Sequence, residues 1–363
     1  MQFYEFKETQ ERVILIGVQT EVGDDVEASL DELDELAETA GAETVAKVIQ
    51  NREAVHPGTY IGKGKIEEVA SLLRALDANG VICDDELSPA QLNNLERVLD
   101  CKVMDRTLLI LDIFAGRAVS SEGKIQVELA QLRYRAARLV GLRESLSRLG
   151  GGIGTRGPGE KKLETDRRLI RTRISALKAE LAQVEKHREL IRGKRSRGNL
   201  KTAAIVGYTN AGKSTLLNTL TGAGILAEDK LFATLDPTTR VLELKDGQQI
   251  LLTDTVGFIR KLPHHLVEAF KIKLEEAKYA DYIIHVVDAS NPQAELQMFT
   301  VYETLRELGA TGKKIVTLLN KQDQVTGSGI RDLKADYTEK CSSRRGEGLD
   351  EFNDVLAKLL AEE

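Results

Sequence analysis

The stretch AAIVGYTNAGKSTLLNTL, residues 203 to 220, constrains the fold of this chain more than any other part of the sequence. An apolar segment typical of a strand leads into a loop that runs from Gly207 to Gly212, and a helical segment follows Lys213 and Ser214. In this order of strand, G-x-x-x-x-G-K-[ST] loop and helix, backbone N–H groups face bound phosphates. Lys213 is expected to reach the β and γ oxygens, and Ser214 to ligate Mg²⁺. The stretch predicts a P-loop domain of the α/β class with a mixed, mostly parallel sheet.

Two further motifs indicate that the nucleotide is GTP. In TDTVGF, which follows an apolar strand segment, Asp254 can hold the metal through water and the N–H of Gly257 can meet the γ-phosphate. NKQD also follows such a segment. Asp323 can accept from both N–H donors on the guanine edge, which adenine does not offer, and Lys321 can lie over the ring. The motifs in this order predict a guanine-nucleotide switch.

The segment LFATLDPTTR is the predicted first switch. Thr234 is its candidate for closing on Mg²⁺ and the γ-phosphate, with Thr238 and Thr239 as competing candidates. Where Ras-type GTPases carry a glutamine that orients the attacking water, this chain has Phe258. No catalytic residue is therefore assigned, and only the switch region with Thr234, Gly257 and Phe258 is named for catalysis. Hydrolysis by the protein alone is expected to be slow unless another group or a partner places the water.

The predicted nucleotide site combines the P-loop, both switches, NKQD and the loop CSSRRGEGL, whose serines offer small contacts to the base. The predicted nucleotide-binding residues are Gly207, Tyr208, Thr209, Asn210, Ala211, Gly212, Lys213, Ser214, Thr215, Phe232, Ala233, Thr234, Leu235, Asp236, Asp254, Thr255, Val256, Gly257, Asn320, Lys321, Asp323, Ser342, Ser343 and Arg344. The predicted metal ligands are Ser214 and Thr234, with Asp254 acting through water.

The first zone, residues 1–118, alternates strand and helix patterns. Segments rich in Val and Ile predict strands at 13–18, 44–49, 80–85 and 102–107, and leucines at helical spacing predict helices at 26–40, 65–78 and 88–99. Ser88 before Pro89 fits an N-cap and a first helical turn. This alternation predicts a small α/β domain with parallel strands. Its loop TYIGKGK lacks the G-K-[ST] ending, so we interpret it as an ordinary or RNA-contacting loop.

The second zone, residues 119–198, is strongly basic and has the pattern of a helical hairpin. From residue 121 to residue 200, 20 Lys and Arg stand against 9 Asp and Glu, although the whole chain carries a net charge of −6. Apolar residues recur at helical spacing on both sides of GGGIGTRGPGE: Ile125, Leu129, Leu132, Ala136, Leu139, Leu142, Leu146 and Leu149 before it, and Ile170, Ile174, Leu177, Leu181 and Val184 after it. The pattern predicts two antiparallel helices joined by a glycine-rich tip.

The tip and its flanks are the predicted RNA contacts, since a local basic excess is typical of a polyphosphate partner. The predicted RNA-binding residues are Arg148, Gly151, Gly152, Gly154, Arg156, Gly157, Lys161 and Lys162. The glycines also match G-x-G-x-x-G, but that fingerprint requires a strand before the glycines, and here a heptad-patterned helix precedes them. The alternative of a merely solvated charged face is disfavoured because bases outnumber acids two to one.

Composition adds an expectation about location. The three cysteines are far apart and form no C-x-x-C pair, and no apolar run approaches the length of a membrane span. We expect a cytoplasmic monomer without a membrane span, with loose membrane association left open. The third zone, residues 199–363, is the predicted GTPase domain.

The motifs GGGIGTRGPGEKKLETDRR, GYTNAGKST, FATLDPTTR and DTVGF together resemble the HflX family of translation-associated GTPases. The resemblance implies binding to the large ribosomal subunit and its rRNA, insertion of the hairpin tip near the peptidyl transferase centre, and separation of stalled or idle ribosomes in the GTP state. It also implies that the ribosome stimulates hydrolysis. Three features depart from the family pattern: Ile272 and Lys273 replace small polar residues, CSSRRGEG is a loose form of the S-A-K motif, and the chain ends where many relatives add a C-terminal domain.

Two other functions remain open at this stage. The hairpin of a nucleotide-gated switch could bind a protein rather than RNA. Alternatively, the chain could remodel RNA, either by hydrolysing ATP in the first zone or by hydrolysing GTP in the third zone.

Overall fold

A computed structural model describes most of the chain. The described residues are 11–20, 25–147, 158–196, 200–222, 231–232, 235–261, 276–325 and 329–362; within these, only the backbone is described for 140–147, 158–163, 185, 187, 189 and 191–196. The chain divides into two compact units, one formed by residues 1–116 with 128–177 and the other by residues 117–127 with 178–363. Among the described residues, no helix is both long enough and apolar enough to cross a bilayer.

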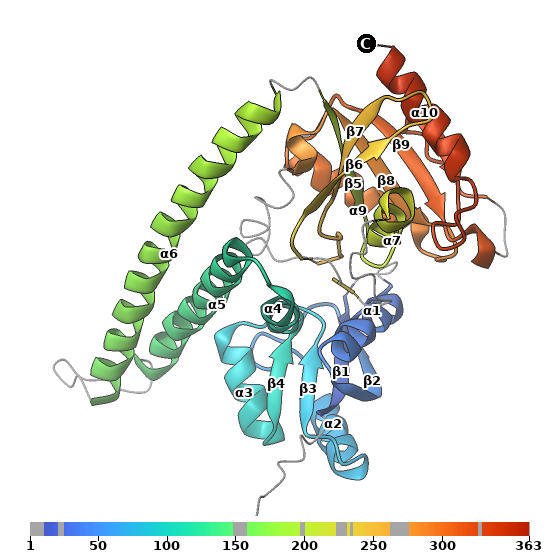
Figure 1. Cartoon of the computed structure of the whole chain (residues 1–363). Coiled ribbons are helices and arrows are strands. Elements are labelled where there is room, and N and C mark those ends of the chain that lie inside the picture. Colours follow the sequence, from blue (N-terminus) through green and yellow to red (C-terminus); the bar gives the residue numbers. More distant parts are fainter. Residues whose placement is uncertain are drawn as a thin grey trace, which may run out of the picture. The chain divides into compact units, whose positions relative to one another are not determined.

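The first unit contains a parallel four-stranded sheet in the order β2-β1-β3-β4 (Figure 1). The strands are β1 (Arg12–Gln19), β2 (Glu43–Asn51), β3 (Gly80–Cys83) and β4 (Lys102–Asp105), and the helices are α1 (Val26–Thr39), α2 (Lys63–Ala75), α3 (Pro89–Leu99) and α4 (Arg106–Arg117). Ser88 and Gln91 form a reciprocal capping box at the start of α3, with Pro89 in its first turn. The predicted α/β architecture with parallel strands is confirmed.

The predicted strand at 102–107 is too long, because β4 ends at Asp105, and helix α4 was not predicted. Asp105 ends β4 because its carboxylate accepts a hydrogen bond from Leu108 N at 2.9 Å, which caps the helix that follows. Arg106 then begins α4 with its guanidinium buried against Asp84 at 2.9 Å and Glu32 at 3.1 Å. The run LLILDIF in α4 is almost continuously apolar, so it lacks the helical period that would have identified it.

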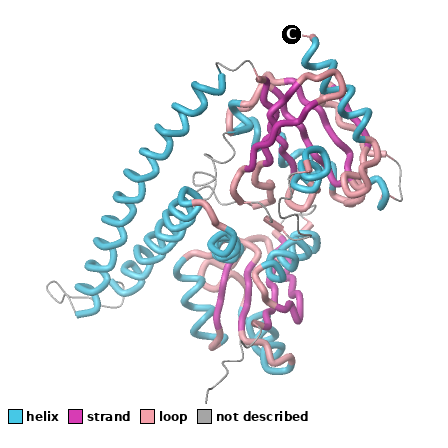
Figure 2. The backbone as a smooth tube through the Cα atoms, viewed as in Figure 1, coloured by secondary structure: helices cyan, strands magenta, loops and turns pink. Residues whose placement is uncertain are grey.

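The helical hairpin consists of α5 (Ser121–Ser147) and α6 (Pro158–Ser196), both visible as long cyan coils in Figure 2. A bidentate ion pair joins them, with Arg173 Nε and Nη2 at 2.7 and 2.9 Å from the Glu128 carboxylate. The predicted apolar seam is buried at Leu129 on α5 and at Leu177 and Leu181 on α6. The predicted antiparallel hairpin is confirmed. Its helices are divided between the two compact units, after residue 127 on α5 and after residue 177 on α6.

The second unit contains a six-stranded sheet in the order β10-β9-β8-β5-β7-β6 (Figure 1). The strands are β5 (Lys201–Gly207), β6 (Thr238–Glu243), β7 (Gln249–Asp254), β8 (Tyr282–Asp288), β9 (Lys314–Asn320) and β10 (Tyr337–Lys340), and the helices are α7 (Lys213–Thr221), α9 (Ala294–Glu307) and α10 (Leu349–Ala361). All neighbouring strands are parallel except β6 and β7. Their turn contains Asp246 and Gly247, and the φ of +84° at Gly247 suits glycine.

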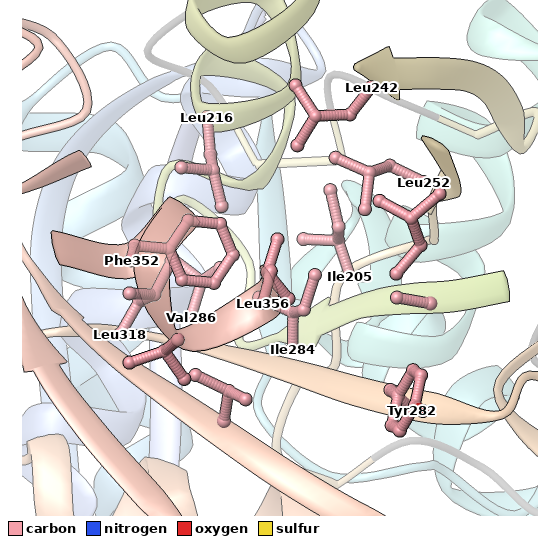
Figure 3. Close-up of a cluster of buried hydrophobic side chains, with 14 of the residues drawn as sticks. Ile205, Leu216, Leu242, Leu252, Tyr282, Ile284, Val286, Leu318, Phe352 and Leu356 are labelled. Carbon is pink, nitrogen blue, oxygen red and sulfur yellow. The ribbon is translucent and has the colours of Figure 1, made fainter. Parts of the chain in front are cut away.

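A continuous apolar core holds this sheet against its helices (Figure 3). Ile205 of β5, Leu252 of β7 and Ile284 of β8 are fully buried, as are Leu216 of α7 and Phe352 of α10. Burying each such side chain contributes about 1.5–3 kcal/mol. The core therefore fixes β5 and α7, the two elements that flank the P-loop.

Candidate nucleotide-binding site

The two motif glycines of the P-loop are required by close approaches of the chain. A Cβ at Gly207 would lie 2.2 Å from the carbonyl oxygen of Val286 on the neighbouring strand β8. Gly212 has a φ of +97°, and a Cβ there would lie 2.3 Å from Asn320 Nδ2. Gly212 directly precedes the first residue of α7, so the N–H groups of the first helical turn are directed toward the loop. This is the arrangement that phosphate binding requires.

Lys213 lies across the loop with its ammonium group buried. Its Nζ donates to the carbonyl oxygen of Tyr208 at 2.6 Å. Burial lowers the pKa of Lys213 to about 8, against the opposing influence of nearby Asp254. The site therefore holds a desolvated cation that an anionic ligand would stabilise in its charged form.

Ser214 and Asp254 provide oxygen ligands of the kind that Mg²⁺ prefers. Ser214 Oγ donates to Asp254 Oδ2 at 2.7 Å, and Asp254 is fully buried at the end of β7. A hydroxyl beside a carboxylate is a hard, oxygen-only donor set, so these residues fit Mg²⁺. The remaining predicted ligand, Thr234, and its neighbour Ala233 lie outside the described residues.

The DTVGF segment lies directly against the P-loop. Phe258 N donates to Gly207 O at 3.1 Å, and Thr209 N donates to Phe258 O at 2.8 Å, so the two segments form a short parallel bridge. A Cβ at Gly257 would lie 2.9 Å from Lys213 Nζ and 2.8 Å from the Cα of Thr209, which leaves room only for glycine. The ring of Phe258 is 2% exposed. It is buried and has no polar atom with which to orient water.

Other predicted residues in these segments have mainly structural contacts. The hydroxyl of Thr255 donates to Ile205 O at 2.7 Å, and the hydroxyl of Tyr208 accepts from Arg260 N at 2.8 Å. In the first switch, Phe232 and Leu235 are buried. Several further predicted residues belong to the same segments: Asn210 and Ala211 in the loop, Thr215 in α7, and Val256 in the DTVGF segment.

The residues predicted to recognise the base come together at the ends of β9 and β10. Asn320 donates to Ala211 O at 2.8 Å and accepts from Ser343 N at 2.8 Å, so it connects the P-loop to the CSSRRGEGL loop. Ser342 Oγ donates to Asp323 Oδ1 at 2.8 Å, and this hydrogen bond lowers the pKa of Asp323. The carboxylate is thus held in its charged, accepting form. Arg344, also predicted here, is an exposed residue of the same loop.

Sequence reasoning missed two partners of this site. Asp288, the last residue of β8, forms an ion pair with Lys321 at 2.8 Å and so positions a residue predicted to lie over the base. Arg345 Nε lies 3.6 Å from Asp323 Oδ2. The ending VVDAS of a buried strand was the available signal for Asp288, because the carboxyl ends of parallel strands meet at one edge of the sheet.

Asp236, predicted to bind nucleotide, has its carboxylate bonded elsewhere. It accepts hydrogen bonds from Val119 and Ser120, which directly precede α5.

The predicted RNA contacts fall largely outside the described residues. Arg148, Gly151, Gly152, Gly154, Arg156 and Gly157 lie there, as do Ile272 and Lys273. Lys161 and Lys162 belong to the backbone of α6, but their side chains are not described.

Family models match three successive segments of the chain. Residues 27–115 match a model described as GTP-binding GTPase N-terminal, residues 117–195 one described as GTP-binding GTPase Middle Region, and residues 202–321 one described as 50S ribosome-binding GTPase.

Curated relatives named GTPase HflX are similar over most of their length. The protein from Lacrimispora saccharolytica is 68% identical over 357 residues, covering 98% of this chain and 84% of the relative. That from Escherichia coli is 44% identical over 358 residues, covering 97% of this chain and 84% of the relative. Among solved structures, an SsGBP complex with GDP is 27% identical with a TM-score of 0.54, covering 97% of this chain and 99% of that one. A GTP-binding protein from Sulfolobus solfataricus, also in complex with GDP, is 26% identical with a TM-score of 0.50 and the same coverage.

Proposed function

This chain belongs to the HflX family of GTPases, and from that premise we propose that it binds the large ribosomal subunit through its basic hairpin and separates ribosomal subunits in its GTP state. The observation that carries the proposal is the basic excess between residues 121 and 200 of an otherwise acidic chain. Exposed cations of this zone include Arg168, Arg171 and Lys178 on α6. A cationic helix pair of this kind suits the phosphate backbone of rRNA.

GTP is the substrate, and different residues of the chain would bind its phosphates, its base and the metal ion. The N–H groups of the P-loop and Lys213 would hold the phosphates, and Asp323 would select guanine. Ser214 and Asp254, joined by Thr234, would place Mg²⁺. When bound, this ion neutralises charge on the phosphate oxygens.

The buried ring of Phe258 supports the proposal that hydrolysis is slow in the free protein. A group that orients water is needed for rapid hydrolysis, and a phenyl ring lacks both donor and acceptor. The ribosome would order such a group or supply it, so that hydrolysis follows binding.

Sedimentation with purified large subunits tests the proposal. We expect subunit occupancy to be at least about fivefold higher with a non-hydrolysable GTP analogue than with GDP. Deleting residues 151–157 should preserve GTP binding but abolish subunit separation, as followed by light scattering of intact ribosomes. Equal occupancy in the GDP, GTP-analogue and empty forms, or separation by the deletion variant, would contradict the proposal. ATP turnover that survives Lys213→Ala would instead favour RNA remodelling from a second site.

A further inference from the structure

Asp236 connects the first switch to the root of the hairpin. Its Oδ2 accepts hydrogen bonds from Val119 N at 3.2 Å and Ser120 N at 2.8 Å, and its Oδ1 accepts one from Ser120 Oγ at 2.6 Å. These partners lie 116 and 117 positions earlier in the chain. One carboxylate of the LFATLDPTTR segment therefore fixes the two residues that lead into α5.

Ser120 is itself the residue that caps α5. Its Oγ accepts from Gly123 N at 2.9 Å, and its carbonyl oxygen accepts from Lys124 N at 3.0 Å. A negative charge at this end of a helix also interacts favourably with the helix dipole. Asp236 thus holds the cap of the helix rather than a side chain farther along it, so any shift of Asp236 must displace the start of α5 or break these hydrogen bonds.

The root of the hairpin extends from α5 to α6. Glu122, in the first turn of α5, forms an ion pair with Arg188 of α6 and accepts a hydrogen bond from Gln126 Nε2 at 3.2 Å. The side chains of Glu122 and Arg188 are only 16% and 23% exposed, so solvent screens this pair incompletely. A displacement of the start of α5 would therefore act on both helices.

The phosphate site is connected to Asp236 through described residues. Ser214 donates to Asp254, and Asp254 is paired with Thr238 in the antiparallel register of β6 and β7. Thr238 is two residues from Asp236, which holds Ser120. All five residues belong to one compact unit. This path ends at the helix that leads to the predicted RNA-binding tip.

We propose that Asp236 couples the state of the nucleotide to the hairpin through the cap of α5. A γ-phosphate that binds the first switch changes the hydrogen bonds between Asp236 and Ser120. Because the 27-residue helix α5 is about 40 Å long, a small rotation at its root moves the end of the helix nearest the tip. The consequence for ribosome binding rests on the proposed function, whereas the coupling within the free protein does not.

Hydrogen exchange on the full chain, without ribosomes, tests the coupling directly. We expect amides of residues 117–127 to exchange at rates that differ at least about fivefold between the GDP and GTP-analogue forms. Asp236→Ala removes its acceptor contacts with Val119 and Ser120, and Ser120→Ala removes the hydroxyl contact. Each should reduce this difference, Asp236→Ala to within about twofold.

Asp246→Ala is the matched control, because Asp246 lies beyond the opposite end of β6 and accepts a local turn hydrogen bond from Gln248 N at 3.0 Å. It should retain the wild-type response. Nucleotide affinity is measured for every variant, and Ser120→Ala decides the test if Asp236→Ala binds nucleotide poorly, since Ser120 lies outside the nucleotide-binding segments.

The coupling is overturned if the wild type shows no nucleotide-dependent exchange at residues 117–127, or if Asp236→Ala and Ser120→Ala both respond as the wild type does. Sedimentation with large subunits separates this failure from failure of the proposed function. If large-subunit occupancy does not depend on the nucleotide while hydrogen exchange at residues 117–127 still does, only the ribosomal function is contradicted. Occupancy that depends on the nucleotide in both variants as in the wild type would contradict the role of this coupling in ribosome binding and leave the proposed function intact.

Discussion

At the scale of single residues, the carboxylate of Asp323 is held in position by neighbouring side chains of the protein. Its Oδ1 accepts from Ser342 Oγ, and Arg345 lies near its Oδ2. Lys321 is positioned by a different group, because it forms an ion pair with Asp288. If Asp323 accepts from the base edge and Lys321 lies over the base face, as predicted, these two contacts depend on different carboxylates.

We expect replacement of Asp323 and replacement of Asp288 to change nucleotide affinity in different ways. In Asp323→Asn the side-chain amide presents a donor to the guanine N–H groups, so GTP affinity should fall at least about tenfold and affinity for xanthosine triphosphate should rise. Titration with fluorescent analogues of both nucleotides measures the ratio. Asp288→Asn is the control, because it should weaken both nucleotides alike. An unchanged ratio in Asp323→Asn would remove Asp323 from base recognition.

Most residues of the nucleotide site were predictable because they belong to motifs with fixed local spacing. Gly207 and Asp254 lie at the ends of strands, and Gly212 and Lys213 lie at the start of α7, as the motif order predicts. The hydrogen bonds of Asp236 were not predictable, because Ser120 is 116 positions away and no local pattern relates the two. Contacts of that kind depend on the tertiary fold.

At the scale of secondary-structure elements, Asp105 organises the junction of β4, α4 and α5. It is fully buried and accepts from Leu108 N at the start of α4, from Tyr134 OH at 2.8 Å, and from Arg138 Nη2 at 2.5 Å. The Arg138 guanidinium also lies 3.2 Å from the centroid of the Tyr134 ring. A charge buried with this many partners is costly to alter.

Loss of this carboxylate should destabilise the first unit. Asp105→Asn leaves Arg138 without its charge partner and should lower the free energy of unfolding by about 3 kcal/mol. Tyr134→Phe removes one hydroxyl and should cost about 1–2 kcal/mol. Denaturant-dependent hydrogen exchange of β4 and α4 measures both. Asp31→Asn is the control: Asp31 is exposed and paired with Lys47, so its effect should stay below about 1 kcal/mol, and an equal loss in all three variants would refute the role of Asp105.

The elements themselves were predictable where composition or period was clear. The strands β1, β2 and β3 follow from segments rich in Val and Ile, and the seam of the hairpin follows from the helical spacing of its apolar residues. Helix α4 was missed because its apolar residues are nearly continuous, so period alone does not distinguish it from a buried strand.

At the scale of the whole molecule, the separation of charge predicts a strong dependence on salt. If the hairpin replaces counterions on rRNA, affinity for large subunits should fall by orders of magnitude between about 50 and 200 mM salt, as it does for proteins with about 6–10 phosphate contacts on DNA. The triple variant Arg168→Gln, Arg171→Gln, Lys178→Gln should bind more weakly and with a shallower salt slope. Sedimentation across a salt series measures both quantities.

A control variant that removes the same number of positive charges outside the hairpin tests whether the salt dependence comes from the hairpin. Arg331, Lys340 and Lys358 are exposed cations outside the hairpin, and their joint replacement by Gln should leave the slope unchanged. A slope near zero in the wild type would favour the alternative in which the hairpin grips a protein.

The division of α5 and α6 between the two compact units has a practical consequence for dissecting the protein. A fragment cut just before β5 would lack residues 117–127 and 178–196 of the second unit, and with them Val119 and Ser120, which donate to Asp236. Such a fragment would report the behaviour of a truncated GTPase rather than of an intact one. Fragments designed for crystallisation or kinetics should therefore keep both helices, since no single cut in the chain separates one whole unit from the other.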